Sequence, residues 1–453
     1  SWQLGDNNLF EKNGDKFTAK QRLRTQIDVI ASESLKGVLF LEMGDQNWGS
    51  SKDGASLGTD GKIVKVRYSY VDWVIPQTDA KVRMGLQNFS LPGFISNNPI
   101  LGGGSADGAG ITISGQFTEN VGASLFWLRA ENDNTDGYRG NPSSNAMDFV
   151  GLTVPMTFDG VKVTPWVMYA AMGPGMFDNL EKDPGNAWGR ASAGMVSGFQ
   201  GTDWNDSYGN AFWAGVTGEV TYWDPFRIAW DVNYGSASYE DQKMNREGWL
   251  ASLLLEYKLD WGTPGLYGWY STGDDNNPRN GSERMPTVYA NGNNDFSNFA
   301  FNGNPYIARE KALGSTMVGT WGIGARLKDV SFLEDLKHTL RVNFMGGTNA
   351  PKMAKYVSDY AAYDKRGVSS VVETGFGYDP VYLTTEDYAL EVGLTNTYKM
   401  YDNFTVMLDA AYLALWLDDS RSTWGKNPMR GFSGKDGGVY DAWNVNLSFV
   451  YSF

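Results

Sequence analysis

The last eleven residues of the chain, Trp443–Phe453 (WNVNLSFVYSF), decide the fold. Every second residue from Trp443 onward is aromatic or large and aliphatic, and the residues between them are mostly Asn and Ser. This period of two is typical of a β-strand with one apolar and one polar face. Its length exceeds the ~5–6 residues of an average strand in a soluble sheet. The pattern therefore favours a strand that crosses a lipid bilayer.

The same alternation recurs along the whole chain. It runs through Phe17–Val29, Trp249–Leu259, Tyr388–Leu394 and Phe404–Trp416. No segment has the ~18 consecutive apolar residues of a membrane-spanning helix. We therefore expect an all-β chain, a transmembrane antiparallel β-barrel whose outward strand faces are apolar.

The connections between the expected strands alternate in length. Short turns such as Gln77–Asp79 and Asp159–Gly160 separate long polar segments such as Asn88–Gly108 and Gly273–Gly314. Outer-membrane barrels have this asymmetry, with tight periplasmic turns and long external loops. The count from Lys16–Ala31 to Trp443–Phe453 is odd, and a short first strand ending at Trp2–Gly5 makes it even. We expect 18 strands, with 16 as the alternative, in one domain that spans residues 1–453.

Composition excludes several classes of protein. The 453 residues contain no cysteine and one histidine, which excludes disulfide frameworks, thiolate zinc sites and sites built from several histidines. The net charge of −14 argues against a nucleic-acid partner. The only nucleophile motif, GASLG around Ser56, lies in a Gly/Ser segment without the strand–turn–helix setting that it needs. We therefore expect a protein without enzymatic activity.

The chain end and the N-terminal third carry a family resemblance. The ending FVYSF, with Tyr451 and the terminal Phe453, resembles the assembly signal of Gram-negative outer-membrane proteins. The segments Phe17–Gly49 and Val71–Phe94 resemble the outer-membrane homotrimeric porins of Desulfovibrio-type bacteria. This resemblance implies a homotrimer of water-filled barrels in the outer membrane, in contact with lipid and lipopolysaccharide and assembled by the barrel-assembly machinery. It also implies that the third external loop folds inward.

Basic side chains gather on the inward phase of three neighbouring strands. These residues are Lys20, Arg22 and Arg24, then Lys65 and Arg67, then Lys81 and Arg83. A charged side chain facing lipid near mid-height costs roughly 2–4 kcal/mol, so this phase must face the lumen. Such a wall attracts anions in a narrow aqueous passage. In the competing interpretation, Asp28 and Glu42 neutralise these bases, and the resulting ion pairs hold the wall rigid without attracting anions.

The segment 88–108 is the candidate constriction loop. Its run Gly102–Gly104 allows sharp bends close to the wall, and its one acidic residue is Asp107. We expect a channel for passive diffusion of small hydrophilic solutes and ions with a mild anion preference. One alternative is a channel selective for a sugar or an organic acid, with Trp166, Trp213, Tyr267 and Trp269 on the inward phase. A more distant one is a secreted all-β carbohydrate-active protein.

We expect no obligatory cofactor. Two acidic loop segments have the oxygen-rich spacing that calcium prefers, but neither completes a calcium-binding loop with its closing Glu, so solvated loops are the favoured interpretation. The residues concerned are Asp133 and Asp136 in the first segment, and Asp274 and Asp275 in the second.

Overall fold

A computed structural model describes residues 1–6, 9, 15–104, 106–132, 146–173, 194–197, 208–290, 295–301, 311–354, 381–424 and 439–453. The main sheet consists of β1 (Trp2–Asp6), β2 (Lys16–Ser32), β3 (Leu35–Asn47), β4 (Val64–Val74), β5 (Lys81–Asn88), β7 (Asp107–Gln116), β8 (Gly122–Asn132), β9 (Ala146–Thr153), β10 (Met156–Phe158), β11 (Val161–Met172), β12 (Gly209–Val220), β13 (Phe226–Tyr239), β14 (Arg246–Tyr257), β15 (Thr263–Ser271), β17 (Thr320–Leu333), β18 (Leu336–Gly347), β19 (Tyr388–Tyr401), β20 (Phe404–Trp416) and β21 (Ala442–Tyr451). A separate parallel pair joins β6 (Leu101–Gly102) to β16 (Tyr289–Ala290). Two single turns of 3₁₀-helix are η4 (Gln242–Met244) and η5 (Pro351–Met353).

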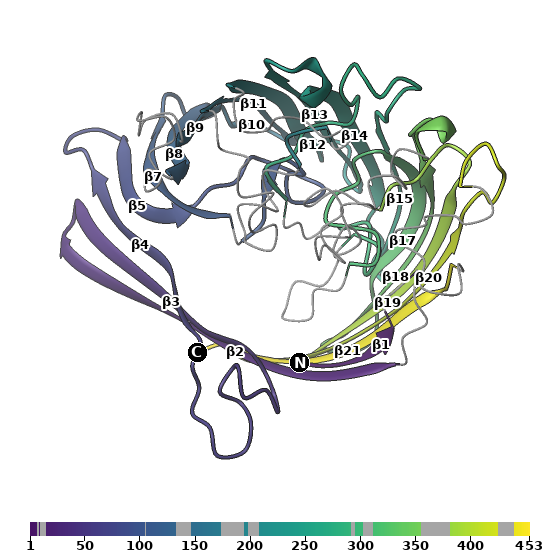
Figure 1. The fold of residues 1–453 in the computed structure, drawn as a ribbon. Coiled ribbons are helices and arrows are strands. Elements are labelled where there is room, and N and C mark those ends of the chain that lie inside the picture. Colours follow the sequence, from purple (N-terminus) through teal and green to yellow (C-terminus); the bar gives the residue numbers. More distant parts are fainter. Residues whose placement is uncertain are drawn as a thin grey trace.

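The main sheet closes into a barrel of 18 strands, which confirms the larger of the two predicted counts. Each strand pairs antiparallel with its neighbours in the chain, and β1 closes the ring by pairing with both β2 and β21 (Figure 1). The sheet has 19 segments because β9 and β10 pair with successive parts of β11 and form one barrel strand. The interruption falls at Val154 and Pro155, where proline lacks the N–H that a ladder requires. Among the described residues, no helix is long and apolar enough to cross a membrane.

The strand faces follow the alternation of the sequence. On β21, Phe449 and Tyr451 are exposed on the outside, whereas Asn446 and Ser448 are buried on the inside. The boundaries of β20 and β14 agree with the predicted strands to within three residues. The sheet is polar inside and apolar outside because side chains of a strand alternate between its two faces.

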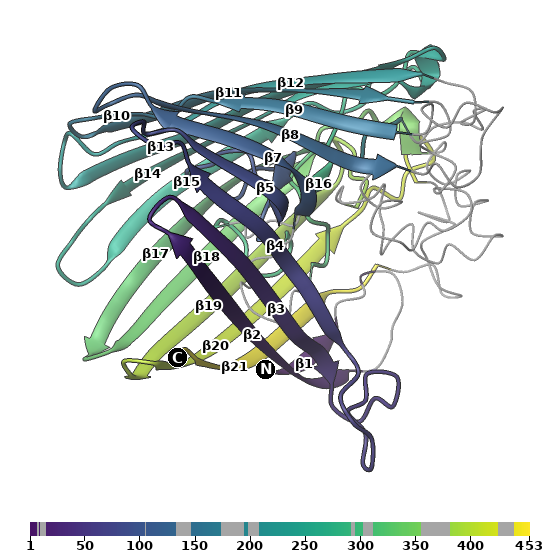
Figure 2. The same ribbon diagram turned by 90° about the vertical axis from the view of Figure 1, so that its left-hand side faces the viewer.

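The connections at one end of the barrel are short and most of those at the other end are long, as predicted (Figure 2). At one end the turns are short, for example 159–160 and 402–403. At the other end most connections are long, and two of them are used below under the names L3 (89–106) and L7 (272–319). The exception at this end is 240–245, which turns tightly because the Asp241 side chain accepts a hydrogen bond from the Lys243 backbone N–H.

The apolar core lies inside the barrel. L3 and L7 enter the ring of strands (Figure 1), and their side chains Ile100, Phe296, Phe299 and Phe301 are buried against the inner wall. The lumen is therefore partly filled, and the inner wall from β8 to β20 supplies a hydrophobic surface for the two loops.

Candidate functional site

L3 runs inside the lumen from β5 to β13, which is six barrel strands further round the ring. The Asp231 carboxylate of β13 accepts hydrogen bonds from the backbone N–H groups of Phe94 (2.9 Å) and Ile95 (3.0 Å) at the loop tip. Beside it, the Asn98 amide of the loop donates to Asn233 of β13 (3.1 Å). The segment 88–108 therefore lies inside the barrel, in the position expected of a constriction loop.

The loop is shaped by its own hydrogen bonds. Asn98 donates to the Pro92 carbonyl and accepts from the Ile100 backbone N–H, which closes the tip into a tight turn. Gly103 has a φ of 84°, a left-handed conformation that side chains disfavour. The predicted bend at Gly102–Gly104 is therefore present.

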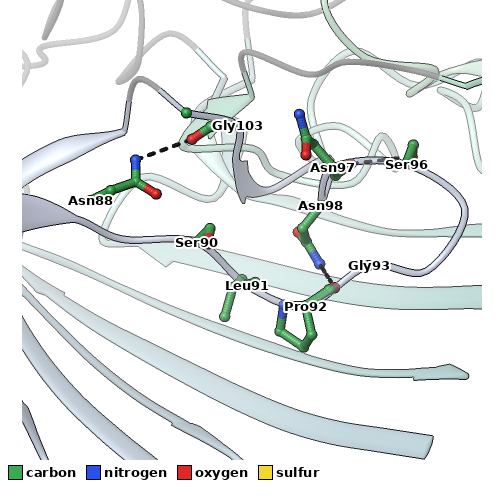
Figure 3. A pocket seen from close by; sticks show the side chains of 10 residues that line it. Asn88, Ser90, Leu91, Pro92, Gly93, Ser96, Asn97, Asn98 and Gly103 are labelled. Atoms are coloured by element: carbon green, nitrogen blue, oxygen red, sulfur yellow. Dashed lines mark hydrogen bonds between the residues drawn. The ribbon is translucent and has the colours of Figure 1, made fainter. Parts of the chain in front are cut away.

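A small polar cavity of about 340 Å³ opens in this loop. Asn88, Ser90, Asn97, Asn98 and the backbone of Gly103 line it (Figure 3). Asn88 donates to the Gly103 carbonyl (3.1 Å) across one end. The lining offers hydroxyl, amide and backbone groups, which suits hydrated polar solutes.

The predicted basic wall is a paired cluster around Glu42. The carboxylate of Glu42 is buried (4% exposed) and accepts from Arg24 (2.8 Å), Arg67 (3.0 Å) and Lys65 (3.4 Å). Arg67 is also buried, and it donates to both oxygens of Asp107 and to the Gly104 carbonyl. Arg67 therefore ties the root of L3 to the wall, and Asp107 acts as its counter-ion.

Two of the other predicted bases have partners that the sequence did not reveal. Arg83 forms a two-pronged pair with Asp72 (2.7 and 2.8 Å), and Arg22 pairs with Asp45 (3.3 Å). Asp28, which neutralises this wall in the competing interpretation, pairs instead with Lys36. In the described part of the chain, the other two bases of the wall, Lys20 and Lys81, have no ion-pair partner.

Among the described residues, seven bases thus face four carboxylates on this wall, which leaves an excess of positive charge in that part of the structure. Sequence alone could not identify Asp45 as the partner of Arg22, because a register shift between Gln21 and Arg22 sets the pairing of β2 with β3. Asp72 lies directly opposite Arg83 in the pairing of β4 with β5.

L7 also narrows the lumen, from the side of β15 and β19. That this loop folds inward was not predicted from the sequence. The Phe296 ring stacks on Tyr267 of β15, with centroids 4.0 Å apart and planes inclined by 4°. Glu391 of β19 is buried and accepts from the backbone N–H groups of Asn298 and Phe299 (both 2.8 Å). L7 is therefore held in the same way as L3: a buried carboxylate of the barrel wall accepts hydrogen bonds from backbone N–H groups of the loop.

A belt of alternating charges runs along the inner wall beneath these loops. The ion pairs join, in order, Lys162, Glu219, Arg227, Glu256, Arg326, Asp295 and Arg341. The belt passes over β15 at Gly265, where a Cβ atom would lie 3.1 Å from the Glu256 side chain and 3.4 Å from that of Arg326. The small residue leaves room for Glu256 to reach Arg326 across the intervening strand.

The belt also includes a loop residue, Asp295 of L7. Burial alone would raise the pKa of Asp295, but the charges of Arg326, Lys328 and Arg341 outweigh it and hold the pKa below its ordinary value. Asp295 is therefore ionised over the neutral range and fixes L7 to β17 and β18.

The four inward aromatic residues that could have formed a sugar track are buried. Trp213 donates to the Pro286 carbonyl of L7, and Trp269 donates to Thr320. Trp166 and Tyr267 are at most 5% exposed. All four are inward, as predicted, but they support the inner wall and L7 instead of lining the water path.

The remaining predicted residues lie at the ends of the barrel. Tyr451 and Phe453 are exposed at the short-turn end, where their rings stack with centroids 5.9 Å apart. Their role as an assembly signal stays a prediction.

Of the acidic pairs considered for calcium, Asp133 and Asp136 lie outside the described residues. The Asp274 carboxylate accepts from the hydroxyls of Ser282 and Tyr382, and burial raises its pKa. Asp275 accepts from the Asn277 backbone and the Asn280 amide. The described residues contain no group of three or more acidic or histidine side chains that could hold a metal.

No family model and no curated protein matches the sequence. Among solved structures, the chain is similar to the outer-membrane protein OprD of Pseudomonas aeruginosa, with 11% identity, a TM-score of 0.54 and coverage of 99% of this chain and 90% of that one. It is also similar to OpdK of the same organism, in a structure with vanillate, with 8% identity, a TM-score of 0.51 and coverage of 99% and 95%. OpdL of that organism gives 9% identity, a TM-score of 0.50 and coverage of 100% and 96%. At these identities the likeness establishes the fold alone, a closed antiparallel β-barrel.

Proposed function

We propose that the protein is a channel of the Gram-negative outer membrane through which small hydrophilic solutes diffuse passively. The observation that carries this proposal is the closed barrel, which is apolar outside and polar inside and is narrowed by L3 without losing its charged wall. Closed barrels satisfy every backbone hydrogen bond, so they are stable in lipid. The likeness to OprD and OpdK supports the same class of protein.

We further propose a mild anion preference. The wall around Glu42 keeps an excess of positive charge, and low-dielectric surroundings focus its field into the narrow water. The overall charge of −14 favours cations, but charges more than ~8 Å from the ion path are largely screened in physiological salt. The wall therefore outweighs the loop acids.

The test is the reversal potential of purified protein in a planar bilayer under a salt gradient. We expect wild type to prefer anions and Arg24→Glu to shift toward cations, because the Arg24 side chain is one-third exposed to the lumen. The matched control is Arg129→Glu. Arg129 lies over the ring of Trp127, which is exposed on the outer face, so the same change in charge should leave the reversal potential unaltered. Cation preference in the wild type would overturn the anion proposal.

A solute-selective channel is the second candidate. Two inner loops narrow the lumen, and OpdK was solved with vanillate, an aromatic carboxylate. Since Trp166, Trp213, Tyr267 and Trp269 are buried, organic acids suit this lumen better than sugars. Current interruptions that increase with the concentration of benzoate but not of maltose would favour this candidate over general diffusion.

We also propose a homotrimer, in contact with lipid and lipopolysaccharide and inserted by the barrel-assembly machinery through Tyr451 and Phe453. Conductance that appears in steps of three, together with an oligomeric band on unheated gels, would support it. A compact monomer band and single steps would overturn the trimer but leave the channel proposal intact.

A further inference from the structure

The cavity in L3 has a frame that is fixed at both of its ends. At the root of the loop, Arg67 donates to the Gly104 carbonyl, and at the tip Asp231 accepts from the backbone N–H groups of Phe94 and Ile95. The pairing of β6 with β16 adds a third attachment, to L7. The cavity is therefore preorganised, and a solute that enters it does not have to order the loop first.

Three polar groups of the cavity are available to a solute. The Ser90 hydroxyl, the Asn97 amide and the side-chain oxygen of Asn88 have no hydrogen-bond partner among the described residues. Ser90 is exposed and the two asparagines are half-buried, so a molecule in the lumen can reach all three groups. Figure 3 shows Ser90 on one segment of the loop and Asn97 on the segment that faces it. In contrast, the Asn98 amide already donates to the loop and to β13, and it shapes the cavity.

The lining of the cavity is neutral. None of its ten residues, all within the described part of the chain, has a charged or an aromatic side chain. Asp107, which accepts from Asn88 (3.4 Å), is already paired with Arg67. A carboxylate solute would therefore find no cation in the lining to offset the loss of its hydration, and a sugar ring would find no aromatic side chain to pack against.

The available groups select for a particular kind of solute. An asparagine side chain presents a donor and an acceptor side by side, and a serine hydroxyl can both donate and accept. Neighbouring hydroxyls of a polyol, or the N–H and carbonyl of an amide, offer the matching combination. The Pro92 ring, which also lines the cavity, provides an apolar surface for the carbon atoms of such a molecule.

We propose that the cavity of L3 is a binding site for small uncharged solutes that carry neighbouring donor and acceptor groups, either polyols or amides. This inference rests on the proposed channel function and adds a second class of solute to it. Anions follow the basic wall around Glu42, whereas uncharged molecules bind at the neutral part of L3.

Saturation-transfer difference NMR of the purified full chain in detergent tests the site, with glycerol and acetamide as probes. We expect the ligand signal of wild type to reach a plateau as the probe concentration rises. Ser90→Ala combined with Asn97→Leu removes two of the available groups, and we expect a roughly tenfold lower affinity from the lost hydrogen bonds. Ser114→Ala is the matched control, because Ser114 lies on the inward face of β7 but outside the cavity lining, and it should bind as wild type does.

The outcomes separate the binding site from the channel. A plateau with glycerol alone supports a polyol site, and one with acetamide alone supports an amide site. A signal that rises linearly with both probes, or one that the double variant retains in full, would overturn the site. The conductance of the same samples in potassium chloride tests the channel separately, and the double variant should conduct as wild type does because its charged wall is intact. Binding without any conductance in wild type would overturn the channel but not the site.

Discussion

Arg67 has a structural task that its charge alone does not reveal. Its guanidinium contacts Glu42, Asp107 and the Gly104 carbonyl, so it joins the barrel wall to the root of L3. Lys20 and Lys81 on the same wall have no ion-pair partner within the described residues. Residues that a sequence pattern groups together therefore separate into one that holds the loop and others that contribute net charge.

We predict that Arg67→Gln will loosen L3. Hydrogen bonds to charged groups contribute about 1.5–3 kcal/mol each, and the variant leaves the buried Glu42 with fewer donors. Single-channel recordings should show larger current fluctuations and a weaker anion preference. Lys81→Gln removes the same charge from a residue that does not bind L3, so it should weaken the anion preference without increasing the current fluctuations. Equal fluctuations in the two variants would contradict the anchoring role of Arg67.

Sequence reasoning placed the seven bases on the inward face because that inference needs only alternation within each strand. The acids that neutralise them depend on register between strands. At Gly44, with φ of 113°, β3 contains an extra residue opposite β2, and this shift brings Asp45 to Arg22. Such bulges have no clear signature in a sequence rich in glycine, so the pairing was not predictable.

At the scale of elements, L3 and L7 are fastened by carboxylates on distant strands. Asp231 accepts hydrogen bonds from the backbone of L3, and Glu391 accepts them from the backbone of L7. Glu391 and its donors in L7 are 92–93 residues apart in the sequence. The inward fold of L3 was expected from the resemblance to trimeric porins, whose third external loop folds inward, and the glycines of this segment permit the bends that it needs. The inward fold of L7 was not predicted, because Gly273–Gly314 has the composition of a solvated loop and the residues that anchor it are remote in the sequence.

We predict that Asp231→Asn will release the tip of L3. The amide can offer one oxygen where two backbone N–H groups and the Thr217 hydroxyl now converge on a carboxylate. Conductance should rise or fluctuate between levels, and the barrel should resist heat as before. Thr217→Val, which leaves the carboxylate in place, serves as control and should have the smaller effect. Unchanged conductance in Asp231→Asn would mean that the apolar contacts of Ile95 and Ile100 hold the loop alone.

The anchoring of L7 should depend on pH only in acid. Because the pKa of Asp295 is lowered in the folded protein, its ion pairs with Arg326 and Arg341 stabilise L7 above the ordinary carboxyl pKa and are lost as pH falls through the folded value. The contribution of these ion pairs to the anchoring of L7 should therefore be constant near neutral pH and be lost below about pH 4, with a corresponding change in conductance. In Asp295→Asn the acid transition should be reduced. A transition centred near neutral pH would exclude Asp295 as its cause.

At the scale of the whole molecule, the ring depends on a strand of five residues. β2 and β21 run in the same direction, and β1 lies between them antiparallel to both. The even count of 18 was predictable because strands of a hairpin barrel alternate in direction, so an odd count leaves two parallel neighbours. The sequence of Trp2–Gly5 alone is too short to identify as a strand. It was predicted to be a strand because the ring needs one more strand to close with an even number.

We predict that Gly5→Val will open this seam. A Cβ atom on Gly5 would lie 2.4 Å from the Trp443 carbonyl oxygen and 3.0 Å from the Asn444 Cα, so the side chain must push β1 away from β21. Unpaired strand edges then face lipid, where each unsatisfied backbone group costs several kcal/mol. The folded band on unheated gels should convert to the unfolded form at a markedly lower temperature. Gly115→Val is the matched control, because Gly115 is also the penultimate residue of its strand and its Cβ would meet no atom closer than 3.6 Å. If both variants convert at the wild-type temperature, β1 does not close the barrel, and the two long strands beside it must meet in another way.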